Sequence, residues 1–288
     1  QSATVRRRVR CGLTPAGTLA AGAVVLVGCG SFGDLFRGQD EAPLPGTRIS
    51  VLTLEEQIIA DPGLAGLEVG LPVPYVNKGW PQAGGHPSHA MHHVALPDHI
   101  SQVWRVSIGA GNSRARRLTA SPVVASGVIY VMDTESSVSA YRTFDGELLW
   151  KRNMAPRFEE RGAIGGGVAV YEDTLYVSTA YGDLQALSSV SGALLWSTPI
   201  GIPLRGAPTV AAGRAYVLTH DNQLHAVDAV TGEVLWNHVG IQEGAGLVGG
   251  VSAAVAGDMV VVPYTSGEIF VLRPENGRVA WSDSLSRT

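Results

Sequence analysis

The chain has 288 residues, of which 45% are hydrophobic and 16% charged, with 36 glycines and 16 prolines. This composition is apolar enough to bury a core and excludes a chain that is disordered throughout. The net charge is −4, but residues 1–28 hold four arginines and no acid, so the remaining 17 basic and 25 acidic residues give −8. Because residues 29–288 are this acidic, they have no overall attraction for phosphate backbones, and we expect no nucleic-acid partner.

The amino terminus has the pattern of an export signal. Four arginines within residues 6–10 precede an uncharged run over residues 11–28 that ends in small residues. The order basic, then moderately apolar, then small is typical of a secretory signal peptide, which we predict over 1–28. A membrane-spanning helix is one alternative, weakened by Pro15 because a span needs about 20 strongly apolar residues. A twin-arginine signal at Arg7 and Arg8 is another, but it lacks the expected Phe-Leu-Lys continuation.

Residues 26–29, Leu-Val-Gly-Cys, resemble the lipobox of bacterial lipoproteins. In such proteins the cysteine sulfur is alkylated by diacylglycerol and the signal is cut before it. The resemblance implies a lipid anchor on Cys29 and, with Gly30 and no aspartate next to it, an outer-membrane location. The second cysteine, Cys11, lies inside the signal, so the body has no disulfide and no cysteine nucleophile.

Residues 29–78 are rich in proline and glycine, which break any long element. We predict a tether here, long enough to hold a following domain clear of a bilayer surface. One stretch, residues 51–60, is compatible with a helical turn or two or with a strand. The interrupting residues are Pro43, Pro45, Pro62, Pro72, Pro74, Gly38, Gly46, Gly63, Gly66 and Gly70.

A repeat organises the rest of the chain. Tryptophans recur at intervals of 46, 46, 40 and 45 residues. The last four each follow a glycine by four residues, and an apolar triplet centres sixteen residues before each of these glycines. Turn signals separate these anchors, so each unit is predicted to be four short strands joined by tight turns. The five tryptophans are Trp104, Trp150, Trp196, Trp236 and Trp281, and the triplets centre on Tyr130, Tyr176, Tyr216 and Val261.

A period of about 40–45 residues with four strands is typical of a β-propeller blade. The sequence therefore predicts an all-β fold with a partial propeller over residues 79–288. Four blades are complete, and an incomplete unit is expected around Trp80 to Trp104. The recurrent Trp and Tyr side chains are expected to fill the gaps between blades. Because a closed propeller pairs its first and last strands, we expect the chain to be the amino-terminal part of a longer protein.

Residues 226–236, Ala-Val-Asp-Ala-Val-Thr-Gly-Glu-Val-Leu-Trp, resemble the repeat named after pyrroloquinoline quinone (PQQ) enzymes. Quinoprotein dehydrogenases share this repeat with the BamB family, the propeller lipoproteins of the outer-membrane β-barrel assembly (BAM) machinery. Residues 79–85, Gly-Trp-Pro-Gln-Ala-Gly-Gly, resemble the opening of the BamB propeller, and with the lipobox they make that family the closer match. The resemblance implies an eight-bladed propeller, of which four to five blades are present here. It also implies a non-catalytic scaffold that helps insert β-barrel proteins into the outer membrane.

In that family, a loop with a Leu-x-Leu-Arg-Gly-like segment docks on POTRA domains of the barrel-inserting, BamA-like subunit. Residues 202–206, Ile-Pro-Leu-Arg-Gly, resemble this segment, which implies that Ile202, Leu204 and Arg205 bind the partner. We expect the loop to project from the rim with Arg205 exposed, since an arginine among apolar residues suits an interface hot spot. An ordinary surface loop is the alternative. Residues 244–251 lack the acidic residues that the family often places there. Unfolded outer-membrane proteins are a further implied partner.

No pattern predicts catalysis, a cofactor or a metal. The histidine-rich stretch from His86 to His99 is bracketed by Pro87 and Pro97 and has only Asp98 as a nearby carboxylate, so a solvated or packed loop is favoured over a metal site. We therefore predict that the protein is not an enzyme. One alternative is a PQQ-dependent quinoprotein dehydrogenase, which would need quinone-stacking and Ca²⁺-ligating residues. The other is a cell-wall or polysaccharide binder.

Overall fold

The computed structural model describes residues 61–114, 116–156, 164–244 and 251–285. The chain divides into two compact units, Gln1–Glu68 and Val69–Thr288. The described part of the first unit contains one short 3₁₀ helix, η1 (Pro62–Leu64). Asp61 caps it, because its side chain accepts a hydrogen bond of 2.8 Å from the backbone N–H of Gly63. Among the described residues, no helix is long and apolar enough to cross a membrane.

The second unit has sixteen strands in its described residues, arranged as four antiparallel sheets of four. Each sheet takes four consecutive strands in chain order, so every sheet is a simple meander. This architecture confirms the predicted all-β blades. The strands are β1 (Val123–Ala125), β2 (Val128–Met132), β3 (Ser137–Arg142), β4 (Leu148–Asn153), β5 (Gly166–Tyr171), β6 (Thr174–Thr179), β7 (Asp183–Ser188), β8 (Leu194–Pro199), β9 (Thr209–Ala211), β10 (Arg214–Leu218), β11 (Gln223–Asp228), β12 (Val234–Val239), β13 (Ala254–Ala256), β14 (Met259–Pro263), β15 (Glu268–Leu272) and β16 (Val279–Ser284).

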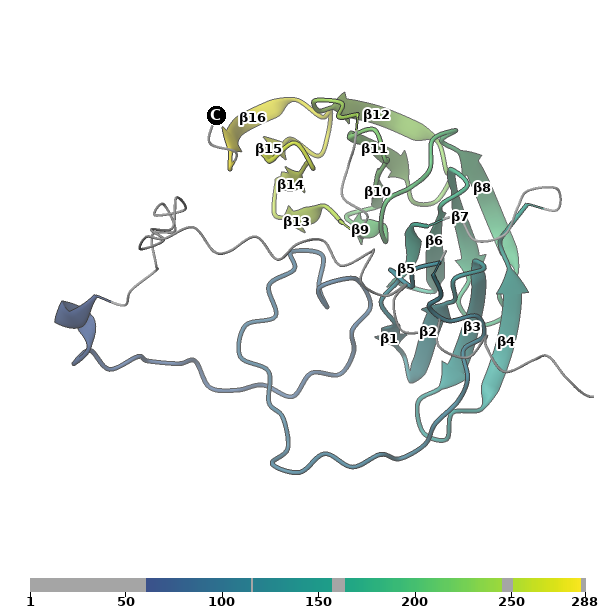
Figure 1. Cartoon of the computed structure of the whole chain (residues 1–288), viewed down its shortest axis with the longest axis horizontal. Helices are drawn as coiled ribbons and strands as arrows, with labels where there is room; N and C mark the ends of the chain where they lie inside the picture. Colours follow the sequence, from purple (N-terminus) through teal and green to yellow (C-terminus); the bar gives the residue numbers. More distant parts are fainter. Residues whose placement is uncertain (1–60, 115, 157–163, 245–250, 286–288) are drawn as a thin grey trace, which may run out of the picture. The chain divides into compact units, whose positions relative to one another are not determined.

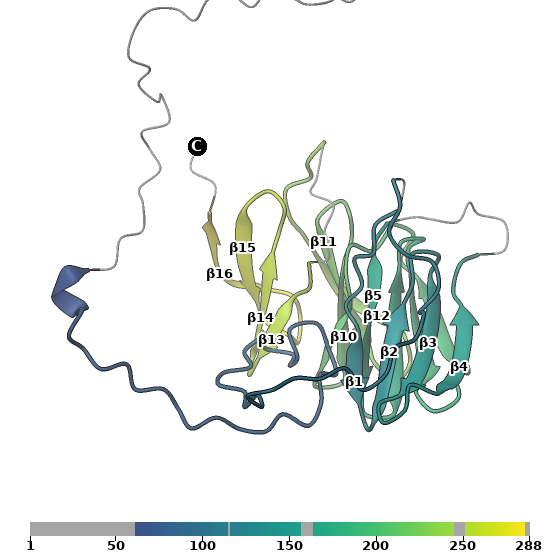
Figure 2. The ribbon, with the colours of Figure 1, turned by 60° about the horizontal axis from the view of Figure 1, so that its bottom comes forward.

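The four sheets of this unit follow one another in an arc (Figure 1). The first strand of each sheet lies on the inner side of the arc and the fourth on the outer side. Figure 2 shows the same sheets side by side, with β1–β4 and β13–β16 at opposite ends of the row. Strands β1, β5, β9 and β13 approach their neighbours in that order. They therefore line the axis about which the blades are stacked.

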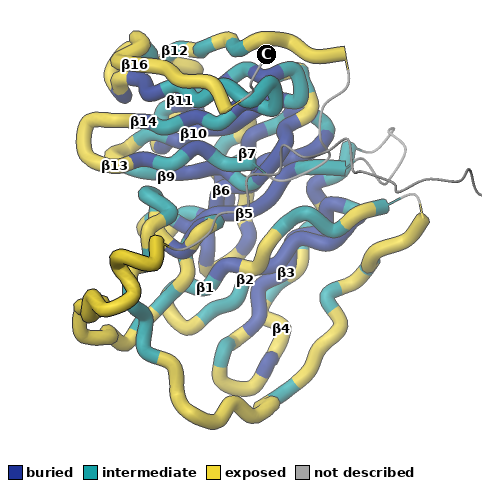
Figure 3. The backbone as a smooth tube through the Cα atoms, turned by 60° about the vertical axis from the view of Figure 1, so that its left-hand side comes forward, coloured by how far each residue is buried: buried dark blue, intermediate teal, exposed yellow. Residues whose placement is uncertain are grey.

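The core lies between the blades. The first hydrophobic cluster joins Tyr130 and Met132 of β2 to Val168 of β5 and Val177 of β6, and two further clusters join the later blades in the same way. Figure 3 shows buried backbone along the inner and middle strands and exposed backbone along much of the outer strands. A blade thus buries both faces only when it has neighbours, which explains why the units occur as an array.

The tryptophan of each of the first three blades docks on the next blade. The indole N–H of Trp150 donates to the backbone carbonyl of Ser189 at 2.9 Å, in the turn between β7 and β8. A Cβ on Gly192 of that turn would lie 2.7 Å from the Trp150 ring, so the glycine is required by space as well as by its φ of 69°. The prediction that Trp and Tyr fill the gaps between blades is confirmed. The same contact joins Trp104 to Gly146, Trp196 to Gly232 and Trp236 to Gly277.

Within the described residues, the region from Trp80 to Trp104 forms no sheet of its own. Trp104 nevertheless docks like the tryptophan of a blade, because its indole N–H donates to the carbonyl of Thr143 at 2.8 Å. Trp281 in β16 is 52% exposed. The predicted boundaries of signal, tether and propeller stay predictions.

Candidate partner-binding site

The structure buries two of the three residues expected to bind a partner. They lie in the connector between β8 and β9, where Leu204 is 0% and Arg205 is 2% exposed. Ile202 is half-buried and Pro203 exposed. The expectation that Arg205 projects from the rim is therefore wrong, and Ile202 and Pro203 are the parts of the segment that a partner can reach.

Backbone pairing explains the burial. Leu204 forms an antiparallel bridge with Thr219, and the N–H of Arg205 donates to the carbonyl of Leu218 at 2.8 Å. On the other side, the N–H of Gly166 donates to the carbonyl of Leu204 at 3.0 Å. The connector thus runs as a short extra strand between the ends of β10 and β5. This pairing turns the Leu204 side chain into the core between the second and third blades.

The guanidinium of Arg205 holds the loop between β10 and β11. Its Nη2 donates to the backbone carbonyl of His220 at 2.7 Å. Burial lowers the pKa of Arg205 from its ordinary value, and the nearby charge of Glu243 opposes this effect. The pKa of His220 is lowered as well, first by burial and then by the charge of Arg205. At neutral pH we therefore expect a charged Arg205 beside a neutral His220, with the arginine in a positioning role.

The loop between β10 and β11, residues 219–222, ties two connectors together. The N–H of His220 donates to the carbonyl of Pro203 at 2.9 Å. On the opposite side, the side-chain amide of Asn222 donates to the carbonyl of Ile241 at 2.7 Å, where the connector between β12 and β13 begins. Ile241 is 59% exposed. We call Ile202, Pro203, Ile241 and the loop 219–222 the connector face.

The connector face includes residues that sequence reasoning missed. The only sequence signal near these residues is the turn pair Asn222-Gln223, at the end of the loop 219–222 and the start of β11. A turn signal does not indicate a binding surface. Glu243 precedes the acid-poor segment 244–251 and supplies an acidic group close enough to act on Arg205. Residues 245–250 lie outside the described residues, as does Cys29.

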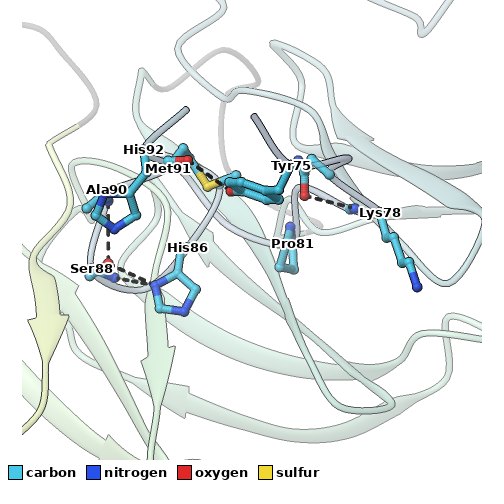
Figure 4. A pocket seen from close by; sticks show the side chains of 11 residues that line it. Tyr75, Lys78, Pro81, His86, Ser88, Ala90, Met91 and His92 are labelled. Carbon is cyan, nitrogen blue, oxygen red and sulfur yellow. Dashed lines mark hydrogen bonds between the residues drawn. The ribbon is translucent and has the colours of Figure 1, made fainter. Parts of the chain in front are cut away.

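The histidine-rich stretch forms a separate surface. Together with Tyr75 and Lys78, it lines an open pocket of about 470 Å³, shown in Figure 4. His86 Nδ1 lies 2.9 Å from the Ser88 hydroxyl, and the Tyr75 hydroxyl donates to the carbonyl of Met91 at 2.9 Å. Across the described part of the chain, no three His, Cys, Asp or Glu side chains are grouped so that they could share a metal ion.

Comparisons with known proteins identify the family. The family model described as outer membrane protein assembly factor BamB matches residues 134–288, more than half of the chain. BamB of Shewanella oneidensis is 28% identical over 190 residues, which cover 63% of this chain and 48% of the relative. BamB of Alteromonas naphthalenivorans is 32% identical over 180 residues, covering 57% and 43%. The chain thus spans less than half the length of these curated relatives.

Solved structures show the same fold. A europium-containing methanol dehydrogenase superposes with a TM-score of 0.59 at 16% identity, over 72% of this chain and 49% of the enzyme. At that identity the likeness concerns the propeller architecture alone. The family model covers the blades that carry the connector face, and on that match the chain belongs to the BamB family of outer membrane protein assembly factors.

Proposed function

We propose that this chain is part of a non-catalytic scaffold lipoprotein that helps assemble and insert β-barrel proteins into the outer membrane. It acts from the periplasmic face, anchored through Cys29, by docking on POTRA domains of a BamA-like subunit, with unfolded outer-membrane proteins as clients. Family membership supports the general role. The observation that carries the docking step is the connector face, where three chain segments are fastened together and leave apolar side chains accessible.

The connector face has the composition of an interface centre. Ile202, Pro203 and Ile241 offer apolar area that a partner would remove from water. Asp221 of the loop 219–222 and Glu243, which is close enough to act on Arg205, add carboxylates to the same region. Apolar centres with polar rims are typical of protein interfaces. In this proposal Ile202 contacts the POTRA domain directly. Leu204 and Arg205 support docking indirectly, because they lie beneath the connector face and hold the backbone of Pro203 and His220 in place.

The test is to place a charge at the centre of the connector face. We expect Ile202→Asp to weaken docking at least tenfold, about 1.4 kcal/mol, because the carboxylate would have to be desolvated against the partner. Co-purification of the barrel-inserting subunit from solubilised membranes, with a melting curve for each variant, measures this effect.

The matched control is Val230→Asp. Val230 is 81% exposed in the turn between β11 and β12, at the other end of the strands from the loop 219–222. We expect this variant to keep both its partner and its melting temperature. Undiminished co-purification of Ile202→Asp would remove the connector face from the interface, and loss with Val230→Asp would place the interface at the other end of the blades.

The scaffold proposal also predicts that the protein does not bind PQQ. Calcium, which such cofactor sites would use, takes six to eight oxygen ligands, and we expect the blades to supply only packing residues. Purified protein incubated with PQQ and Ca²⁺ and then desalted should retain no quinone absorbance, whereas a quinohemoprotein alcohol dehydrogenase treated alike should retain it. Stoichiometric retention by this protein would favour the dehydrogenase-like alternative.

A further inference from the structure

One segment runs along the inner strands of all four blades. Each inner strand has a valine that pairs, in its own sheet, with the residue five positions later. The opposite edge of each inner strand faces the axis, where none of the sixteen described strands lies beside it (Figure 1). At all four valines, residues 80–87 fill that edge. The four valines are Val124, Val170, Val210 and Val255.

The contacts are hydrogen bonds to the backbone of these valines. The N–H of Val124 donates to the carbonyl of Trp80 at 2.8 Å, and the carbonyl of Val124 accepts from Trp80 at 2.7 Å. The N–H of Val170 donates to the carbonyl of Pro81, and that of Val255 to the carbonyl of Pro87, each at 2.7 Å. Both prolines act as acceptors, so their missing N–H groups cost nothing here.

Gln82 binds the third blade, at Val210 of β9, through its side chain. Its Oε1 accepts from the N–H of Val210 at 2.9 Å, and its Nε2 donates to the carbonyl of Val210 at 2.7 Å. The side chain therefore replaces the backbone pair that a neighbouring strand would supply. Gln82 is 2% exposed although it is an amide in a segment without regular structure. Buried amides are retained where their hydrogen bonds are satisfied, as both ends of this one are.

Backbone hydrogen bonds join the residues before this segment to those after it. The N–H of Tyr75 donates to the carbonyl of His93 at 3.1 Å, and the N–H of Ala95 to the carbonyl of Tyr75 at 2.8 Å. Gly84 and Gly85 adopt φ values of 72° and 82°, which let the chain reverse between Gln82 and the histidine-rich stretch. A Cβ on Gly85 would lie 2.5 Å from the sulfur of Met91. The segment is thus an ordered loop whose path is fixed by hydrogen bonds and close packing.

We propose that residues 79–87 form an axial strap, an in-chain partner that occupies the inner edges of the four blades. Unpaired strand edges are templates for pairing with other chains. The strap pairs with one residue of each inner strand through donors and acceptors from one continuous segment, and it couples four blades that are otherwise joined only to their neighbours. While the strap is in place, the outward backbone groups that it binds at Val124, Val170, Val210 and Val255 are closed to pairing with another polypeptide. This inference concerns the axis and does not depend on docking at the connector face.

Hydrogen exchange of the purified full chain tests the strap. In Gln82→Ala, we expect the amide of Val210 to exchange at least tenfold faster than in the unmodified protein, because its acceptor is gone. Amides inside the blade, such as that of Ala226 in β11, should change less than twofold. The matched control is Gln102→Ala, which removes an exposed glutamine outside the strap and should leave the Val210 amide unchanged.

A second variant extends the test to the other blades. Replacing residues 79–87 with nine glycine and serine residues keeps nine backbone carbonyls but removes the side chains that fix the course of the strap, such as the buried Gln82. Because a flexible segment would not hold its carbonyls against the blades, exchange at Val124, Val170 and Val255 should be at least tenfold faster as well. If this variant unfolds throughout, Gln82→Ala decides alone. Unchanged exchange at Val210 in Gln82→Ala would overturn the proposal, because the amide would then be protected by something other than the strap.

Discussion

Replacing Arg205 by glutamate is expected to lower the free energy of unfolding by about 3 kcal/mol or more, because it would put an unpaired carboxylate where a guanidinium is buried. Arg205 is 2% exposed and its Nη2 donates to the carbonyl of His220. The substitution would remove that donor and set a negative charge against a carbonyl oxygen. Chemical denaturation followed by tryptophan fluorescence measures the loss.

Two further variants separate burial from charge. Arg278→Glu makes the same charge change at an exposed position in the turn between β15 and β16, and we expect its effect to stay within about 0.5 kcal/mol. Arg205→Met keeps the aliphatic stem and should fall between the two. Equal denaturation midpoints for Arg205→Glu and Arg278→Glu would mean that Arg205 is solvated in the folded protein.

The burial of Arg205 changes which residue can be used to test docking. An exposed Arg205 could be replaced without harm to the fold, and loss of the partner would then report on the interface. A buried Arg205 cannot serve in this way, because its loss would disturb the loop 219–222 and the connector face with it. Ile202 is the residue of the segment whose replacement tests contact with a partner.

The second large effect is expected at the turn glycines. Gly232→Ala should lower the free energy of unfolding by about 3 kcal/mol, as the sum of a left-handed backbone and an overpacked contact. The φ of Gly232 is 78°, and an added Cβ would lie 2.8 Å from the Trp196 ring and from the hydroxyl of Thr198. Thermal denaturation followed by near-UV circular dichroism reports on both the stability and the packing of the tryptophan.

Gly213→Ala is the matched control. Gly213 has a φ of 73° in the turn between β9 and β10, but a Cβ there would meet nothing within 4 Å. It should cost only the backbone term, about 1 kcal/mol. The difference between the two variants measures the docking of Trp196 and Thr198 on the next blade. Equal losses would show that the indole shifts to make room and that the contact does not lock the blades.

The sequence by itself determined the blades. Their signals are local and recur in every unit: an apolar strand triplet, a turn, and a glycine four residues before a tryptophan. A strand and its neighbour along the chain pair through such short-range patterns, so the repeat predicts the sheets directly. The packing of Trp150 on Gly192 follows from the same pattern, since each unit presents both halves of the contact.

Only the tertiary structure decided the burial of Arg205 and the role of Gln82. Arg205 stands in a stretch with the composition of a surface loop, but its backbone pairs with Leu218. Gln82 meets Val210 across 128 residues of chain. Neither residue belongs to the repeat, and each pairs with a strand of the third blade that only the tertiary fold brings beside it. A polar side chain is exposed by default, and which one is buried depends on which distant backbone groups still lack a partner when the blades have formed.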